Sequence, residues 1–142
     1  MIINALNIKH ILRKHTIHPN KKLGQNFLAD PDIVDSILEI SQVSREDGVL
    51  EIGAGIGSLT VPLSIRAGKV VAVELDTRLV TILMEQLKEH KNGSGNISVV
   101  CTDIMKADLS QLAEELRQTG NNGAPIRNLK VISNLPYCIT SP

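Results

Sequence analysis

The chain has 142 residues, of which 42% are hydrophobic, and it carries 15 acidic and 15 basic side chains. This length suits one domain with a substantial core, and no apolar run approaches the roughly 18 residues that a membrane-spanning helix needs. The two cysteines, Cys101 and Cys138, match no disulfide or metal-binding spacing, which fits a protein of the reducing cytoplasm. The composition therefore excludes membrane proteins and disulfide-stapled frameworks.

Residues 1–29 form a basic N-terminal arm. The arm contains no acidic residue, so it carries +5 and residues 30–142 carry −5; its cations are Lys9, Arg13, Lys14, Lys21 and Lys22. Such a segment suits a phosphate backbone, because each neutralised phosphate releases counterions. We expect the arm to contact RNA. A solvated helix face and an acid-poor targeting peptide are the alternative interpretations.

Hydrophobic spacing predicts two helices near the N-terminus. Ile8, Ile11 and Leu12 recur at helical intervals, which predicts a short amphipathic helix that ends near Pro19. A second helix is expected to begin with Asp30 as N-cap and Pro31 as its first residue.

Beyond Gly48, short apolar segments alternate with helical segments of about 10 to 15 residues. The predicted strands are 49–52, 69–73, 97–101 and 129–132. Strands that alternate with helices imply βαβ crossovers, so we expect an α/β fold with a parallel sheet. The fold is expected to be packed with aliphatic side chains, because Phe27 and Tyr137 both lie inside motifs.

The first predicted strand ends in a glycine-rich turn, residues 51–57, with Gly53, Gly55 and Gly57 at alternate positions. These glycines allow a ligand to approach the backbone before the next helix. The nicotinamide fingerprint G-x-G-x-x-G fails, since its last glycine would fall on Ser58. The turn therefore predicts a nucleotide-like ligand whose anionic group, such as an amino-acid carboxylate, faces the helix N-terminus. Pro62 either fits the first turn of that helix or kinks it.

Acidic residues follow the next two strands. Glu74 lies about 20 residues beyond the glycines, where a carboxylate accepts hydrogen bonds from ribose hydroxyls. Asp76 is better explained as an N-cap. Asp103 is placed to accept a hydrogen bond from an adenine amino group, although a role as a turn former explains it equally well. The carboxyl ends of parallel strands meet at one edge, so these groups are expected to share a crevice.

The last strand leads into Asn134-Leu135-Pro136-Tyr137, a pattern suited to chemistry on an exocyclic base amine. The Asn134 side-chain oxygen and the Leu135 main-chain carbonyl are acceptors for the two N–H groups, while the Tyr137 ring offers a stacking face for an unpaired base. The alternative is that Asn and Pro merely punctuate a strand end.

Together with the segment 24–28 (GQNFL), these motifs resemble the ribosomal RNA adenine N6-dimethyltransferase family, the RsmA/KsgA group, which is similar to the Erm resistance methyltransferases. The resemblance covers roughly residues 5–142. It implies a Rossmann-like class I methyltransferase core, S-adenosylmethionine as cofactor, and dimethylation of adenine N6 in 16S rRNA within the assembling small subunit. It also implies that no metal is needed, because the sulfonium is already an activated leaving group.

The resemblance assigns roles to individual residues. Asn26 and Leu28 would contact S-adenosylmethionine, Gly53 its amino-acid end, Glu74 its ribose and Asp103 its adenine. Gly55 would also belong to the cofactor site. Asn134 would lie between cofactor and target amine, with Leu135 and Tyr137 completing the catalytic set. Residues 30–142 correspond to the N-terminal part of the cofactor-binding domain, and the family pattern continues past Pro142 with further strands and a helical rRNA-binding domain. We therefore expect a truncated enzyme.

Gly24 and Gln25 before Asn26, and Leu135 in the tetrapeptide, favour the small-subunit enzyme over the Erm branch. Two features depart from the family pattern: Cys138 replaces a residue that is more often polar or aromatic, and the chain stops at Pro142. The remaining hypotheses are Erm-like methylation of 23S rRNA, a non-catalytic RNA-binding or ribosome-assembly protein, and a nicotinamide oxidoreductase.

Overall fold

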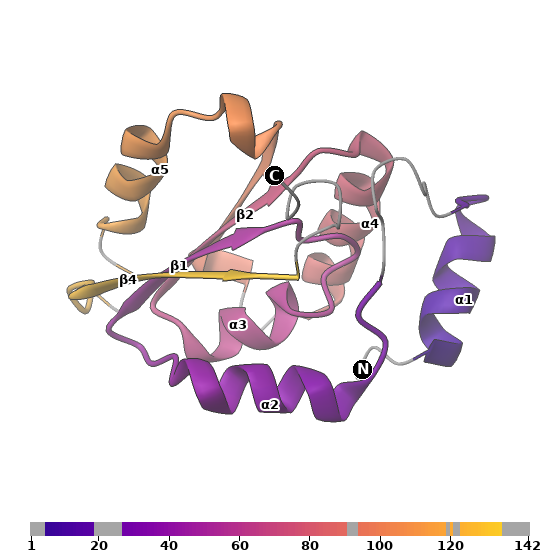
Figure 1. The fold of residues 1–142 in the computed structure, drawn as a ribbon, viewed down its shortest axis with the longest axis horizontal. Coiled ribbons are helices and arrows are strands. Elements are labelled where there is room, and N and C mark those ends of the chain that lie inside the picture. The colour runs from indigo at the N-terminus through magenta and orange to yellow at the C-terminus, as the bar shows by residue number, and fades with distance from the viewer. Residues whose placement is uncertain (1–4, 19–26, 91–93, 119, 121–122, 135–142) are drawn as a thin grey trace, which may run out of the picture.

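The computed structural model describes residues 5–18, 27–90, 94–118, 120 and 123–134, and it contains a parallel sheet with helices on both faces (Figure 1). The strand order is β3-β2-β1-β4. Their bounds are Asp47–Ile52 for β1, Lys69–Glu74 for β2, Ile97–Cys101 for β3 and Asn128–Ser133 for β4. All four predicted strands and the α/β fold class are confirmed, and the predicted strand bounds differ from these by at most two residues.

The sheet has a switch point at the carboxyl end of β1. This strand pairs with β2 on one side and with β4 on the other, so that Ile52 lies opposite both Val73 and Ser133. The chain builds outward from β1 to β2 and β3, then returns to the other side of β1 to form β4. Ligands of open parallel sheets bind at such a point, because the loops on either side diverge there.

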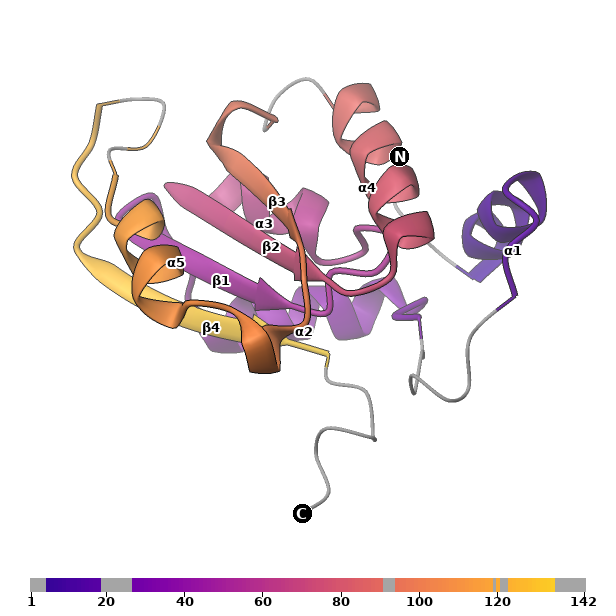
Figure 2. The same ribbon diagram turned by 90° about the horizontal axis from the view of Figure 1, so that it is seen from above.

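Alternating side chains of the strands face two helical layers. Val49 packs with α2 (Pro31–Ser41) and α3 (Thr60–Arg66), whereas Leu50 packs with α5 (Leu109–Leu116) on the opposite face. Helix α4 (Thr77–Glu89) joins the first layer, because Leu83 and Leu87 lie in one apolar cluster with Ala72 of β2. Figure 2 shows α5 in front of the sheet, with α2 and α3 behind it. Two short 3-10 helices, η2 (Ser94–Asn96) and η3 (Ile104–Lys106), flank β3.

The predicted helix starts are confirmed. The Asp30 side chain accepts a hydrogen bond from the Asp32 N–H, and Pro31 is the first residue of α2. Asp76 caps α4 by accepting from the Arg78 N–H. Pro62 lies in the first turn of α3. Backbone N–H groups in the first turn have no partner within the helix, so a proline there costs no hydrogen bond and the helix accommodates it. No helix in the described part of the chain is long and apolar enough to cross a membrane.

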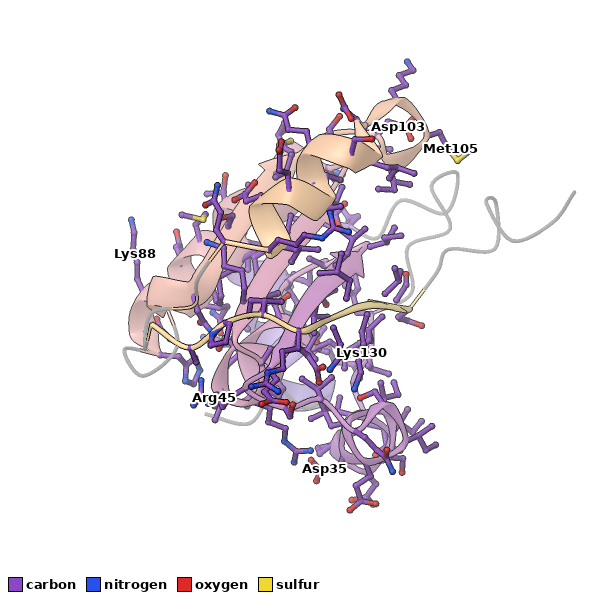
Figure 3. All side chains as sticks on the ribbon, turned by 90° about the vertical axis from the view of Figure 1, so that its left-hand side faces the viewer. Asp35, Arg45, Lys88, Asp103, Met105 and Lys130 are labelled. Carbon is purple, nitrogen blue, oxygen red and sulfur yellow. The ribbon has the colours of Figure 1, made fainter. Side chains whose placement is uncertain are left out.

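Lys130 links strand β4 both to the buried carboxylate of Asp47 in β1 and to the end of α2. The Lys130 ammonium lies 3.0 Å from Asp47 Oδ2 and donates to the carbonyls of Ser41 and Gln42. Figure 3 shows Lys130 reaching from β4 toward α2. Burial would raise the pKa of Asp47, but hydrogen bonds from the Ser44 N–H, Lys130 and Asn128 outweigh it and hold the pKa below its usual value. The pair therefore holds β4 against the first helical layer.

Helix α1 (Ala5–Lys14) confirms the predicted helix of the arm but ends earlier than expected. Thr16 has a φ of 54° in the left-handed region, and the Ile17 N–H donates to the Leu12 carbonyl at 2.8 Å. With the Thr16 N–H bonded to the Arg13 carbonyl, this is a Schellman motif, which closes the helix without help from Pro19. Pro19 itself lies outside the described residues.

Candidate functional site at the carboxyl edge of the sheet

The glycine-rich turn leaves β1 with its backbone facing the edge of the sheet. The N–H groups of Gly53 and Ala54 both donate to the Val73 carbonyl, at 2.8 and 3.1 Å, so the turn begins locked to β2. Gly53 and Gly55 have φ values of 76° and 60°, which glycine adopts without strain. A Cβ atom on Gly55 would lie 3.8 Å from the Phe27 ring, so this ring covers the turn. An aliphatic core was expected, but Phe27 also packs against a core cluster.

Glu74 joins the glycine-rich turn to the loop after β2. Its side chain is 8% exposed, with Oε2 accepting from the Gly55 N–H at 2.7 Å and Oε1 from the Asp76 N–H at 2.9 Å. Each carboxylate oxygen has a second lone pair, which remains available to a hydroxyl donor. Glu74 thus ties the turn to the loop after β2, and its ribose contact stays a prediction.

A second carboxyl group, that of Glu51, lies beneath the turn. It is 2% exposed and accepts a hydrogen bond from Thr60 Oγ1 at 2.6 Å. Burial raises the pKa of Glu51 to about 8; the bond from Thr60 opposes this, and the charge of Glu74 adds to it. Glu51 is therefore mostly protonated at neutral pH. Sequence reasoning gave it no role, although an acid within a buried strand was a signal.

Asp103 is the N-cap of η3, where its Oδ1 accepts from the Met105 N–H at 2.9 Å. The turn-forming role of Asp103 is confirmed, while its adenine contact stays a prediction. Exposed apolar side chains accompany the two acidic strand ends: Leu75 follows Glu74, and Met105 lies beside Asp103 (Figure 3). Sequence reasoning gave Leu75 and Met105 no role. The signal was their position next to the acidic residues.

The structure brings Asn134 to the glycine-rich turn from the other side of β1. Asn134 follows β4 directly and is exposed. A Cβ atom on Gly53 would lie 3.7 Å from the main-chain oxygen of Asn134. The Ser133 hydroxyl, one residue earlier, donates to the Ile52 carbonyl. Glu74 and Asn134 therefore flank the turn, as the meeting of parallel strand ends predicts.

The remaining predicted site residues differ in where they lie. Leu28 is half-buried and packs against the cluster formed with α2 and α3, so its side chain helps to hold the arm on the domain. Lys9, Arg13 and Lys14 are exposed on α1. Five predicted site residues lie outside the described residues: Lys21, Lys22, Asn26, Leu135 and Tyr137.

Comparison with known proteins gives the family and the fold of the chain. The model of the family "Ribosomal RNA adenine dimethylase" matches residues 17–142. The ribosomal RNA small subunit methyltransferase A of Bacillus pumilus is 40% identical over 141 residues, which are 99% of this chain and 45% of that protein. The chain therefore spans less than half the length of this relative.

Solved structures show the same fold. A dimethyladenosine transferase from Plasmodium falciparum has a TM-score of 0.61 and 29% identity, over 82% of this chain and 36% of that one. The 23S rRNA methyltransferase ErmE has a TM-score of 0.60 and 32% identity, over 81% and 39%. An RNA methyltransferase from Salinibacter ruber, solved in complex with S-adenosyl-L-homocysteine, has a TM-score of 0.54 and 25% identity, over 59% and 55%. The α/β sheet is thus that of an S-adenosylmethionine-dependent methyltransferase core, and the chain belongs to the ribosomal RNA adenine dimethylase family.

Proposed function

We propose that this chain binds S-adenosylmethionine at the carboxyl edge of its sheet, for dimethylation of adenine N6 in 16S rRNA of the assembling small subunit in the cytoplasm. The observation that carries this proposal is the convergence of Glu74 and Asn134 on the two sides of the glycine-rich turn. The small-subunit methyltransferase of Bacillus pumilus supports the choice of substrate.

The residues present fit the cofactor. Gly53 and Gly55 carry no side chain of their own that would block its amino-acid end, and Glu74 keeps acceptor capacity for its ribose hydroxyls. Asp103 accepts from the adenine amino group, while exposed Leu75 and Met105 offer apolar contacts to the adenine faces. Asn26 and Leu28 contact the cofactor from the arm. When bound, S-adenosylmethionine supplies a methyl group activated by its sulfonium.

The chain positions the target amine. Its lone pair is delocalised into the adenine ring, so the amine is a weak nucleophile until both N–H groups are held by acceptors. The Asn134 side-chain oxygen and the Leu135 carbonyl serve as these acceptors, and Tyr137 stacks on the flipped base. With both N–H groups held in this way, the amine lone pair would be free to accept the methyl group that the bound cofactor would supply, and the amine would release one N6 proton to solvent. A second round gives dimethyladenosine.

The arm supplies contact to the rRNA backbone. Lys9 and Arg13 are exposed on α1, one helical turn apart, and Lys14 is exposed although it lies 3.8 Å from Glu85. These cations, with Lys21 and Lys22, neutralise phosphates, so RNA binding should weaken steeply with added salt.

The proposal is tested by incubating the chain with S-adenosylmethionine and small subunits that lack dimethyladenosine, then measuring dimethyladenosine by mass spectrometry. Asn134→Ala should abolish transfer and leave cofactor affinity within about twofold of wild type, since its side chain faces the amine. Loss of both would contradict its role. Asp103→Asn keeps the acceptor for the Met105 N–H but replaces the second oxygen with a donor, so it separates the adenine contact from the turn.

The same assay separates the alternatives. The similarity to ErmE favours large-subunit rRNA as the second candidate substrate, and label on large rather than small subunits would support it. Salt-sensitive RNA binding without transfer, unchanged in Asn134→Ala, would instead indicate a non-catalytic assembly protein.

A further inference from the structure

Helix α1 packs against α4 through an apolar cluster that reaches the glycine-rich turn. Ile8 and Ile11 of α1 lie in one cluster with Leu79 and Ile82 of α4 and with Ile56 of the turn, which is 1% exposed. Figures 1 and 2 both show α1 alongside α4, away from the sheet. The arm is therefore continuous, through packed side chains, with the proposed cofactor site.

Phe27 lies between this cluster and the turn. Its side chain packs against the same cluster, and its ring lies 3.8 Å from the position of a Cβ atom on Gly55. Gly55 also donates its N–H to Glu74, the proposed ribose ligand. A displacement of α1 would remove part of the support beneath the Phe27 ring, and with it the cover over the turn.

An ionic contact fastens α1 to α4. His15 Nε2 lies 3.1 Å from Glu85 Oε2, and Lys14 Nζ lies 3.8 Å from the same oxygen. Glu85 lies three residues after Ile82 on α4, so its side chain neighbours the apolar contact with α1. The His15 side chain is 18% exposed, which makes this contact less accessible to water than an ordinary surface pair.

The end of α1 is also held in a costly conformation. Thr16 is β-branched yet has a φ of 54°, and this turn places buried Ile17 against Leu12 in the cluster. A strained residue persists only where its surroundings over-determine it. Here the buried side chain of Ile17 holds Thr16 in this conformation, so the segment that follows α1 is fixed relative to α4.

We propose that Glu85 is a positioning residue for cofactor binding: with His15 and Lys14 it latches α1 onto α4 and so keeps Phe27 against the backbone of Gly55. This inference rests on the proposed cofactor site. If the cofactor binds more tightly when Phe27 lies against Gly55, the contacts of Glu85 raise cofactor affinity. By linkage, the bound cofactor must then stabilise the packing of α1 on α4 to the same extent.

The test compares the full chain with Glu85→Ala and with Glu89→Ala, which removes the same charge from α4. Glu89 is exposed and forms no ion pair with another described residue. Calorimetric titration with S-adenosylhomocysteine should give a Kd about fivefold higher for Glu85→Ala, because affinity falls with the fraction of chains whose arm is docked. Glu89→Ala should bind as wild type does.

Hydrogen exchange of residues 5–18 gives a second readout that needs no activity. In the unliganded chain, Glu85→Ala should speed exchange in α1 and leave β1 and β2 protected, and S-adenosylhomocysteine should slow α1 exchange in wild type. Equal Kd values and equal α1 exchange in wild type and Glu85→Ala would overturn the latch. No binding by folded wild-type chain would overturn the proposed cofactor site and the latch with it.

Discussion

Replacing Glu51 with glutamine is expected to change how stability depends on pH. Glu51 is 2% exposed and its pKa is raised from 4.5 to about 8, chiefly by burial. The folded state therefore holds a proton that the unfolded state releases between these two pH values. Because the folded state binds more protons in this window, the free energy of unfolding falls as pH rises through it.

The magnitude follows from the size of the shift. Each pH unit between 4.5 and 8 lowers the free energy of unfolding of the wild-type chain by about 1.4 kcal/mol, so this free energy is close to 3 kcal/mol lower at pH 7 than at pH 4.5. Glutamine does not titrate and keeps an oxygen that accepts from the Thr60 hydroxyl. The stability of Glu51→Gln minus that of wild type should therefore rise by about 3 kcal/mol between pH 4.5 and 7.

Urea unfolding followed by circular dichroism, at half-unit steps from pH 4.5 to 8.5, measures this difference. Glu89→Gln, an exposed change on α4, is the control and should run parallel to wild type. A constant difference between Glu51→Gln and wild type across the range would refute the reasoning, since it would mean that Glu51 ionises normally in the folded chain.

Three further changes follow from the structure. Thr16→Gly should raise the free energy of unfolding by about 1 kcal/mol in urea titrations, because glycine adopts a φ of 54° without steric cost; an equal or lower value would mean that Thr16 is unstrained. Lys130→Met should lower it by about 2 kcal/mol at pH 7, because buried Asp47 loses its charged partner. That loss should shrink as pH falls through the lowered pKa of Asp47, and a pH-independent loss would point to packing instead. Asp103→Asn should weaken S-adenosylmethionine binding about tenfold in calorimetry and leave thermal stability unchanged, since the η3 cap is kept; unchanged affinity would remove Asp103 from the adenine site.

Much of the fold could be predicted because its signals are local. Apolar strands flanked by helical segments placed all four strands, and Asp30 and Asp76 were correctly predicted as helix caps. The pairing of β4 with β1 was not predicted, because strand order depends on long-range packing that no local pattern encodes. The early end of α1 was missed because threonine is a poor candidate for the left-handed turn that Thr16 makes.

Part of the candidate site could likewise be predicted from the sequence, and part could not. The proximity of Glu74 and Asn134 to one turn follows from the rule that parallel strands share a carboxyl edge, so sequence spacing sufficed. The cover supplied by Phe27, the side-chain packing of Leu28 and the proton on Glu51 depend on what surrounds each residue in three dimensions. Sequence spacing does not contain that information.

The central claim, that the carboxyl edge binds S-adenosylmethionine through Glu74, is tested most directly by calorimetric titration of the cofactor into the 142-residue chain and its Glu74→Ala variant. We expect saturable binding at one site in wild type. The variant, checked for folding by circular dichroism, should bind at least about 100-fold more weakly, because ribose hydroxyls lose a charged acceptor. Equal affinities, or no binding by folded wild-type chain, would contradict the account.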